Sequence, residues 1–317
     1  MSLYLGLDTS AYTTSAALIN ADGDLVADER MVLRVEFGKV GLRQAEAHFQ
    51  HTRNLPVLLE RLSERVTESG LCAIGVSDRP RRLEESYMPV FQAGTGMARC
   101  LAAVSGLPMY RFSHQEGHVA AAHDPRIEDD EFLAVHFSGG TSEVLRVRRR
   151  KTAGYDIQIL FESTDLNAGQ LVDRVGVALG LPFPAGSQLE AIAVEQPTEE
   201  TIPSVVTEKG FSFSGAETRA QHLIQKGLAP GLVAFLTFRC IANTLEKTIR
   251  SGTAETGLTR IVMAGGVMAN TLIRNRLERR LGDAGLTLIW APVSLCSDNA
   301  VGAARLARMN HINMKRG

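Results

Sequence analysis

The sequence contains one structural pattern twice, and this duplication limits the folds open to the chain. Each copy consists of an apolar strand, a short polar loop and two further strands, which is the pattern of a β-meander. The first copy has these elements at residues 3–7, 8–10, 15–19 and 25–33, and the second has them at 132–137, 138–142, 143–147 and 157–162. Because the copies start about 130 residues apart, each can build its own lobe.

Helical patterns separate and follow the two copies. They cover residues 44–66, 94–105, 116–123, 170–179, 230–249, 270–281 and 297–309. Pro56 lies inside the first of them and predicts a kink or a break. Strands that alternate with helices indicate an α/β architecture. We expect a first lobe at residues 1–126 and a second at 127–298, with the C-terminal helix near 299–317 returning to the first.

The composition is that of an ordinary soluble protein, with 44% hydrophobic and 22% charged residues in 317. A formal net charge of -1 gives no global basic field, so RNA binding would need a local patch or a partner. No signal peptide or membrane-spanning run is visible, and the four cysteines are widely spaced. These features predict a cytoplasmic protein without membrane attachment.

His114 and His118 form the sharpest local pattern. Residues four apart lie on one face of a helix, so both imidazoles can bind one metal ion. Two unrelated histidines on a surface helix can have the same spacing. A zinc-protease helix would have Glu directly after the first His, and Gln115 occupies that place, which disfavours a metalloprotease.

A third ligand must come from elsewhere in the chain. Asp298 lies in Cys296-Ser297-Asp298-Asn299, at the expected N-terminus of the last helix. It can be a simple neighbour of the helix cap. As an oxygen ligand it completes a site of two histidines and one carboxylate, which suits Fe or Zn.

The polar loops of the two copies form a second group of candidate binding residues. They are Asp8-Thr9-Ser10 and Ser138-Gly139-Gly140-Thr141. Glycines allow backbone N–H groups to approach a phosphate, and hydroxyl groups add donors. Each loop alone is compatible with an ordinary hairpin turn, but their repetition favours two loops that clamp the phosphates of a nucleotide.

Weaker candidates lie in the second half of the chain. Asp173 could bind ribose hydroxyls, although taken alone it is more typical of a solvated helix face. Gly265-Gly266, followed by Asn270, joins a buried strand to a helix and lets a purine or phosphate lie against the backbone. The basic run at residues 146–151 is typical of a solvated turn rather than an RNA contact.

In their order, these segments resemble the universal tRNA threonylcarbamoyladenosine synthase family, TsaD, over nearly the whole chain. The resemblance rests on the ordered set of motifs around Asp8, His114 and His118, Phe137 to Thr141, Asn167 and Asp173, Phe211 to Gly215, Gly265 to Asn270, and Cys296 to Asn299. No single motif decides it.

The resemblance implies the actin/hexokinase/Hsp70-type (ASKHA) ATPase fold, with two duplicated lobes around a nucleotide cleft. It implies that His114, His118 and Asp298 bind Fe or Zn, and that an adenine nucleotide, either ATP or an acyl-adenylate, is bound. The family's nucleotide and substrate contacts map onto Phe137, Ser138, Gly139, Gly140, Thr141, Asp173, Gly186 and Asn270. The family transfers a threonylcarbamoyl group from an adenylate to the adenosine beside the anticodon of certain tRNAs. Bacterial members work with a smaller paralogue and a P-loop ATPase.

The sequence departs from the family pattern at several places, which identifies it as a divergent paralogue. Ala11-Tyr12-Thr13 stands where the family usually has Cys-Asp-Glu, and Asp78-Arg79-Pro80-Arg81 replaces a Gly-Pro-Gly turn. Thr141 replaces a histidine, and Glu217 replaces a lysine. A carboxylate in place of a lysine would disfavour a nearby phosphate.

Two functions follow from this pattern. The first is a metal-dependent, nucleotide-binding threonylcarbamoyl transferase that acts on tRNA or on a different acceptor. The second is a nucleotide- and metal-binding scaffold or regulator, suggested by the altered residues. No residue is assigned a catalytic role from the sequence.

Overall fold

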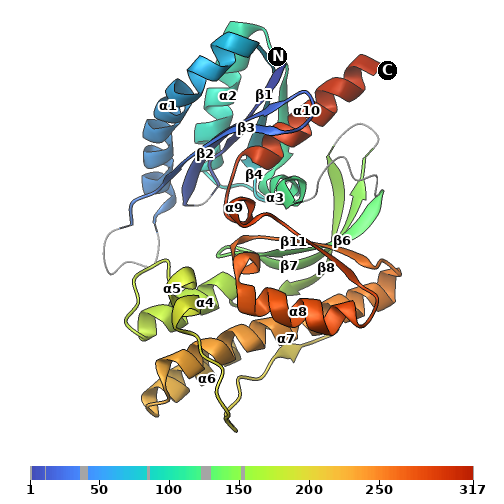
Figure 1. Cartoon of the computed structure of the whole chain (residues 1–317). Coiled ribbons are helices and arrows are strands. Elements are labelled where there is room, and N and C mark those ends of the chain that lie inside the picture. Colours follow the sequence, from blue (N-terminus) through green and yellow to red (C-terminus); the bar gives the residue numbers. More distant parts are fainter. Residues whose placement is uncertain are drawn as a thin grey trace. The chain divides into compact units, whose positions relative to one another are not determined.

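The computed structural model describes residues 2–10, 12–35, 42–83, 86–122, 130–150 and 154–316 (Figure 1). Ala11 and the last residues of two predicted segments, 116–123 and 146–151, lie outside this description. The chain contains two compact units. Unit 1 comprises Met1–Asp130, Arg149–Asp156 and Ser297–Gly317, and unit 2 comprises Glu131–Arg148 and Ile157–Cys296.

Unit 1 is built on a five-stranded sheet with the order β3-β2-β1-β4-β5. Its strands are β1 (Leu3–Asp8), β2 (Thr13–Asn20), β3 (Leu25–Val32), β4 (Leu71–Arg79) and β5 (Met109–Ser113). The first three form an antiparallel meander, whereas β4 is parallel to β1 and β5 is parallel to β4.

Helices cover both faces of this sheet. They are α1 (Gln44–Ser69), α2 (Phe91–Ser105), α3 (His114–Ala122) and α10 (Val301–Arg316). Leu3, Leu5 and Leu7 share one core cluster with leucines of α1. Gly6 faces the other side, since a Cβ there would lie 2.1 Å from the carbonyl oxygen of Ala300, just before α10. Because side chains alternate along a strand, Asp8 lies on the same face of β1 as Gly6.

The second sheet has the order β12-β11-β6-β7-β8-β10-β9. Its strands are β6 (Glu131–Phe137), β7 (Ser142–Arg149), β8 (Tyr155–Ser163), β9 (Val205–Val206), β10 (Gly210–Ser212), β11 (Arg260–Ala264) and β12 (Thr287–Trp290). Strands β8-β7-β6-β11-β12 repeat the order of the first sheet, again with two parallel pairings after the meander. The predicted duplication is therefore confirmed.

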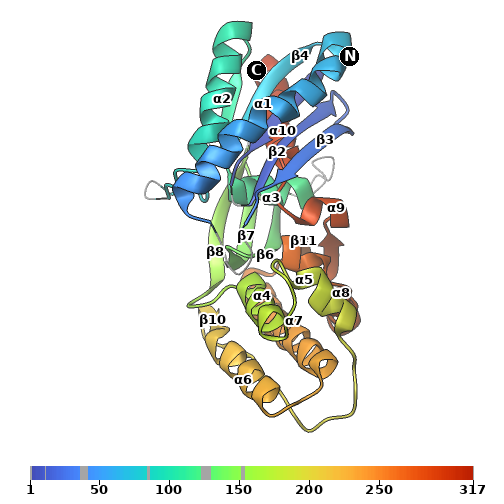
Figure 2. The ribbon, with the colours of Figure 1, turned by 90° about the vertical axis from the view of Figure 1, so that its left-hand side faces the viewer.

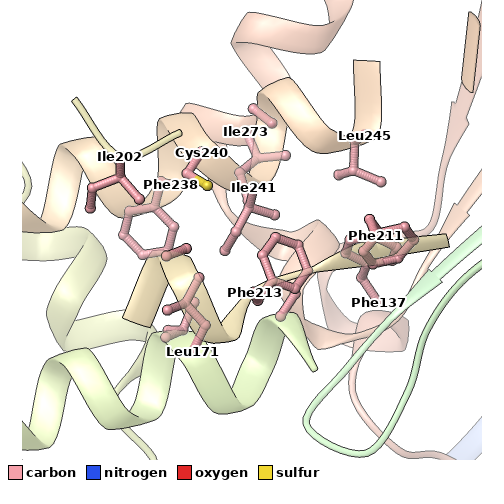
Figure 3. Close-up of a cluster of buried hydrophobic side chains, with 14 of the residues drawn as sticks. Phe137, Leu171, Ile202, Phe211, Phe213, Phe238, Cys240, Ile241, Leu245 and Ile273 are labelled. Carbon is pink, nitrogen blue, oxygen red and sulfur yellow. The ribbon is translucent and has the colours of Figure 1, made fainter. Parts of the chain in front are cut away.

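The helices of unit 2 are α4 (Ala168–Ala178), α5 (Gly186–Ile192), α6 (Ser214–Gln225), α7 (Pro230–Thr256), the 3-10 turn η1 (Gly266–Ala269), α8 (Thr271–Gly282) and α9 (Val293–Cys296). Figure 2 shows the same helices from a second direction. The core contains Phe137, Phe211 and Phe213, and the rings of Phe137 and Phe211 stack with centroids 5.4 Å apart (Figure 3).

Two local predictions need correction. Helix α1 runs through Pro56 without ending, so the predicted break is wrong. Leu55, Leu58 and Leu62 are buried in the core beside the sheet, and this burial offsets the lost backbone hydrogen bond. The last helix begins at Val301, and Ser297 to Ala300 form the segment that leads into it. Among the described residues, no helix combines the length and the apolar character needed to cross a membrane.

Candidate metal centre and nucleotide-binding loops

Close packing of α3 against the start of α10 brings the three predicted ligands together within unit 1. Helix α3 starts at His114, directly after β5, so His118 lies one turn further along the same face. A Cβ on Gly302 would lie only 1.8 Å from the carbonyl oxygen of Gly117. The missing side chain at residue 302 therefore allows the two backbones to touch, which places Asp298 beside the histidines. Figure 1 shows α3 next to the start of α10.

The ligand atoms form a small triangle. Nε2 of His114 and Nε2 of His118 lie 2.9 Å apart. Oδ1 of Asp298 lies 3.3 Å from Nε2 of His118 and 3.5 Å from Nε2 of His114. All three side chains are at most one-fifth exposed. Two imidazole nitrogens and one carboxylate oxygen thus converge on a common point.

Asp8 holds the first ligand in place. Its Oδ2 lies 2.9 Å from Nδ1 of His114, so Nδ1 carries a proton and Nε2 points to the site, where loss of its own proton would free a lone pair for a metal ion. The other oxygen of Asp8 accepts hydrogen bonds from the backbone N–H and the hydroxyl of Ser10. This role was missed in the sequence, where Asp8 counted only as a member of a phosphate loop.

Electrostatics make the centre attractive to a cation. Burial by itself would lower the pKa of His114, but Asp8 and Asp298 outweigh it and raise that pKa to about 10. Burial and the adjacent His114 lower the pKa of His118. Burial also opposes ionisation of Asp298, yet its hydrogen bonds with both histidines hold its pKa well below the usual value. The two ionised carboxylates therefore face the two imidazoles.

Glu116 has a structural role on the other side of α3. It is fully buried and accepts hydrogen bonds from the backbone N–H and the hydroxyl of Ser113, at 2.9 Å each. Arg82 pairs with the same carboxylate. Glu116 is thus held away from the imidazole pair, which gives the protease hypothesis no general base at this position.

The remaining members of the first loop also contact the protein. The hydroxyl of Thr9 donates to the carbonyl of Val90 and accepts from the backbone N–H of Gly94. Thr9 and Ser10 are buried. The altered Thr13 starts β2, where it pairs with Val32.

The second loop, Ser138 to Thr141, is more exposed to solvent than the first. Ser138 accepts hydrogen bonds from the backbone N–H groups of Gly140 and Thr141, which closes a tight turn. Gly139 and Gly140 are exposed, and Gly139 lies against Gly169 at the start of α4. The side chain of Phe137 belongs to the core, so only its backbone borders this loop.

The Gly265-Gly266 turn lies beside the same loop in unit 2. Gly265 has a φ of 96° and packs so closely on Phe137 that a Cβ would lie 2.2 Å from the Phe137 carbonyl oxygen. Asn270 caps α8 by accepting a hydrogen bond from Ile273 N–H. Its Nδ2 is buried, and no described residue accepts a hydrogen bond from it. A buried amide in this state is unusual and has a donor to offer a ligand.

Asp173 and Gly186 meet at the junction of α4 and α5. Oδ1 of Asp173 accepts a hydrogen bond of 2.8 Å from the backbone N–H of Ala185, the residue before Gly186. Burial raises the pKa of Asp173. The neighbouring Arg174 pairs with Glu217 at 2.9 Å. The charge reversal at residue 217 is therefore compensated locally.

The comparisons with known proteins fit this arrangement. The model of the TsaD family, described as tRNA N6-adenosine threonylcarbamoyltransferase, matches residues 35–305. The chain belongs to this family. A TsaD relative from Thermus thermophilus is 32% identical over 325 aligned residues, which cover 97% of this chain and 92% of the relative. A TsaD relative from Streptococcus suis is 29% identical, with 98% and 93% covered.

Solved structures confirm the fold class, which is the two-lobed α/β fold of the ASKHA ATPases. Full-length HypF has a TM-score of 0.65 at 13% identity, covering 98% of this chain and 46% of HypF. Component A of (R)-2-hydroxyglutaryl-CoA dehydratase from Acidaminococcus fermentans has a TM-score of 0.61 at 16% identity, covering 98% and 100%. A ROK family glucokinase from Streptomyces griseus has a TM-score of 0.53 at 12% identity, covering 96% and 99%. At these identities the likeness concerns the fold alone.

Proposed function

We propose that this TsaD family member is a metal-dependent, nucleotide-binding transferase that moves a threonylcarbamoyl group from an adenylate to an adenosine of tRNA. The description of its family names the transfer of a threonylcarbamoyl group to N6 of an adenosine in tRNA. The observation that carries the proposal for this chain is the convergence of His114, His118 and Asp298 in unit 1. The altered residues lie outside that triad.

The three side chains fit an Fe or Zn ion. Ligand atoms about 2 Å from one ion lie roughly 3 to 3.5 Å apart, and the three measured separations are 2.9, 3.3 and 3.5 Å. Two neutral imidazoles with a carboxylate form a donor set common to both metals. When bound, the ion would supply a Lewis acid for an oxygen of the adenylate.

The protein's own groups would set the geometry. Asp8 fixes the ring of His114 with Nε2 directed at the site, and Ser10 in turn holds Asp8. Contact between Gly117 and Gly302 fixes the position of the Asp298 segment. The site is thus rigid before any ligand arrives, which lowers the cost of orienting a reacting group.

Unit 2 offers the groups that would bind the adenylate. The exposed glycines of the Ser138 to Thr141 turn permit close approach of phosphate oxygens. The amide of Asn270 offers a buried donor, and the Gly265-Gly266 turn offers backbone without side-chain bulk. Asp173 would act by holding the backbone next to Gly186, with its second oxygen available for a hydroxyl group.

Family membership favours this enzyme over a non-catalytic scaffold or a transferase with another acceptor. The pairing of Glu217 with Arg174 removes one reason for the scaffold hypothesis, because the added carboxylate is neutralised by a neighbour. By analogy with bacterial TsaD, the partners would be tRNA, a smaller ASKHA paralogue and a P-loop ATPase.

The test is conversion of adenosine in an unmodified tRNA transcript. Purified protein would be incubated with threonylcarbamoyl-adenylate and tRNA, alone and with the two partner proteins, and the nucleosides analysed by mass spectrometry. We expect threonylcarbamoyladenosine to form, and to disappear after removal of metal. A protein that binds nucleotide and metal but yields no product under any of these conditions would be the scaffold. In cells, tRNA from a strain lacking this gene would be compared with tRNA from a strain lacking any second family member.

A further inference from the structure

A small cationic cavity lies in unit 1 where β4 and β5 end. Its volume is about 190 Å³, and it is lined by Asp78, Arg79, Arg82, Arg111, Phe112 and Ser113. Arg111 stands on β5, which is an edge strand of the sheet. The cavity is therefore built from the ends of β4 and β5 and from Arg82, which follows β4. We call it the arginine pocket.

Two hidden carboxylates arrange the three guanidinium groups. Asp78 accepts two hydrogen bonds of 3.1 Å from Arg79 and pairs with Nε of Arg111 at 2.9 Å. Glu116 pairs with Arg82 through both of its oxygens, at 3.3 Å each. These contacts hold the three arginines in one place without occupying all of their donors.

The charge that faces solvent is positive. The side chains of Asp78 and Glu116 are only 3% and 1% exposed, whereas those of Arg79, Arg82 and Arg111 are 37%, 43% and 52% exposed. Three guanidinium groups against two carboxylates leave a formal charge of +1 among these five residues. The negative groups lie beneath the positive ones, so an approaching anion meets arginine first.

The pocket lies next to the candidate metal centre. Ser113 lines the pocket and directly precedes the ligand His114. The backbone N–H of Gln115 donates to the carbonyl of Pro80, which fixes the segment after β4 at the start of α3.

We infer that the arginine pocket binds backbone phosphate of the RNA substrate. This inference rests on the proposed action on tRNA. A chain with a net charge of -1 attracts RNA only through local positive surface, and guanidinium groups bind phosphate oxygens through paired N–H donors. The pocket supplies both, and its lining residue Ser113 directly precedes the candidate metal ligand His114.

The experiment compares tRNA binding by the full-length protein and its variants over a series of salt concentrations. Arg82→Gln and Arg111→Gln keep polar groups in place and remove one positive charge each. Arg61→Gln is the matched control, because Arg61 is also half exposed (51%, against 52% for Arg111) and pairs with one carboxylate, Glu29, at 3.3 Å. Melting temperatures close to that of the control show that the variants fold.

We expect each pocket variant to weaken tRNA binding by a factor of roughly three to ten at low salt. The slope of log affinity against log salt should become shallower by about one unit for each arginine removed. Arg61→Gln should change neither quantity. Equal affinities and parallel salt dependences in all four proteins would overturn the inference, as would a wild-type protein that binds no tRNA.

The outcomes separate this inference from the proposed reaction. If the pocket variants lose tRNA affinity while no threonylcarbamoyladenosine forms in the wild type, the RNA site stands and the proposed reaction fails. If product forms and the variants bind tRNA as the wild type does, the reaction stands and the pocket is a structural ion-pair network. Protection from heat by inorganic phosphate that is lost in Arg111→Gln, without any effect on tRNA binding, identifies a free-phosphate site and also contradicts the RNA assignment.

Discussion

The loop after the first strand occurs twice in the molecule and has two different environments. In unit 1, Asp8, Thr9 and Ser10 are buried, and each side chain contacts the protein itself. In unit 2, Gly139 and Gly140 of the corresponding loop are exposed. The duplicated scaffold thus carries a candidate metal centre in one copy and keeps an open backbone turn in the other. Side-chain chemistry constrains the first loop, whereas backbone access constrains the second.

The largest effect should come from adding a side chain at Gly302, where the backbone contacts Gly117 beside the candidate metal site of unit 1. In Gly302→Ala, the added Cβ would collide with the backbone of Gly117 and push Asp298 away from the histidines. We expect a loss of about 3 kcal/mol in the free energy of unfolding, measured by urea denaturation. Gly96→Ala is the control, since residue 96 is exposed in α2 with no atom near a new Cβ, and it should stabilise the protein by roughly 0.5 to 1 kcal/mol.

The second-largest effect should come from Asp8, and it tests whether the loop of unit 1 supports metal binding while the loop of unit 2 does not. Asp8→Asn keeps the shape of the side chain but removes the charge that orients His114. Metal affinity, measured by titration with a chromophoric chelator, should fall roughly 10- to 100-fold. Ser138→Ala changes the corresponding loop of unit 2 and should leave the affinity unchanged. Equal losses in the two variants would show that the loops do not differ in this way.

A variant of Asn270 tests whether the exposed loop region of unit 2 binds a nucleotide. Ser is as good a helix cap as Asn and adds no buried charge, so Asn270→Ser should alter the free energy of unfolding by less than about 1 kcal/mol. It removes the buried Nδ2 donor, and affinity for an adenylate analogue in calorimetry should fall about 10-fold. Unchanged affinity would exclude this amide from the nucleotide site.

The smallest effect should come from Glu217, the carboxylate that stands where the family pattern has a lysine. Glu217→Lys breaks the pair with Arg174, whose side chain is half exposed, so the cost should be at most about 1 kcal/mol of folding free energy. The double variant Arg174→Glu with Glu217→Lys should recover most of it, as a denaturation series would show. If Glu217→Lys were as stable as the wild type and only the double variant lost stability, the pair would contribute nothing to folding.

Local patterns in the sequence predicted much of this architecture. The repeated pattern of short strands predicted the two meanders, and the four-residue spacing predicted the pairing of His114 with His118. The order of motifs added Asp298. These features are readable because periodicity and ligand spacing are local properties of the chain.

Contacts between distant segments were not predictable in the same way. The bond from Asp8 to His114 joins residues 106 positions apart, and the touching of Gly117 with Gly302 depends on two helices from opposite halves of the chain. Burial of the leucine face of α1 overrode the expected break at Pro56. Such tertiary packing decides where a side chain points, and local propensity does not carry that information.

Metal stoichiometry tests the central claim most directly. Protein purified without chelators would be analysed by elemental mass spectrometry as wild type, as His114→Ala and as His222→Ala, in which the replaced histidine is exposed on α6. The account predicts about one Fe or Zn ion per chain in the wild type and in His222→Ala, and a loss of nearly all bound metal in His114→Ala. The same metal content in all three proteins would contradict it.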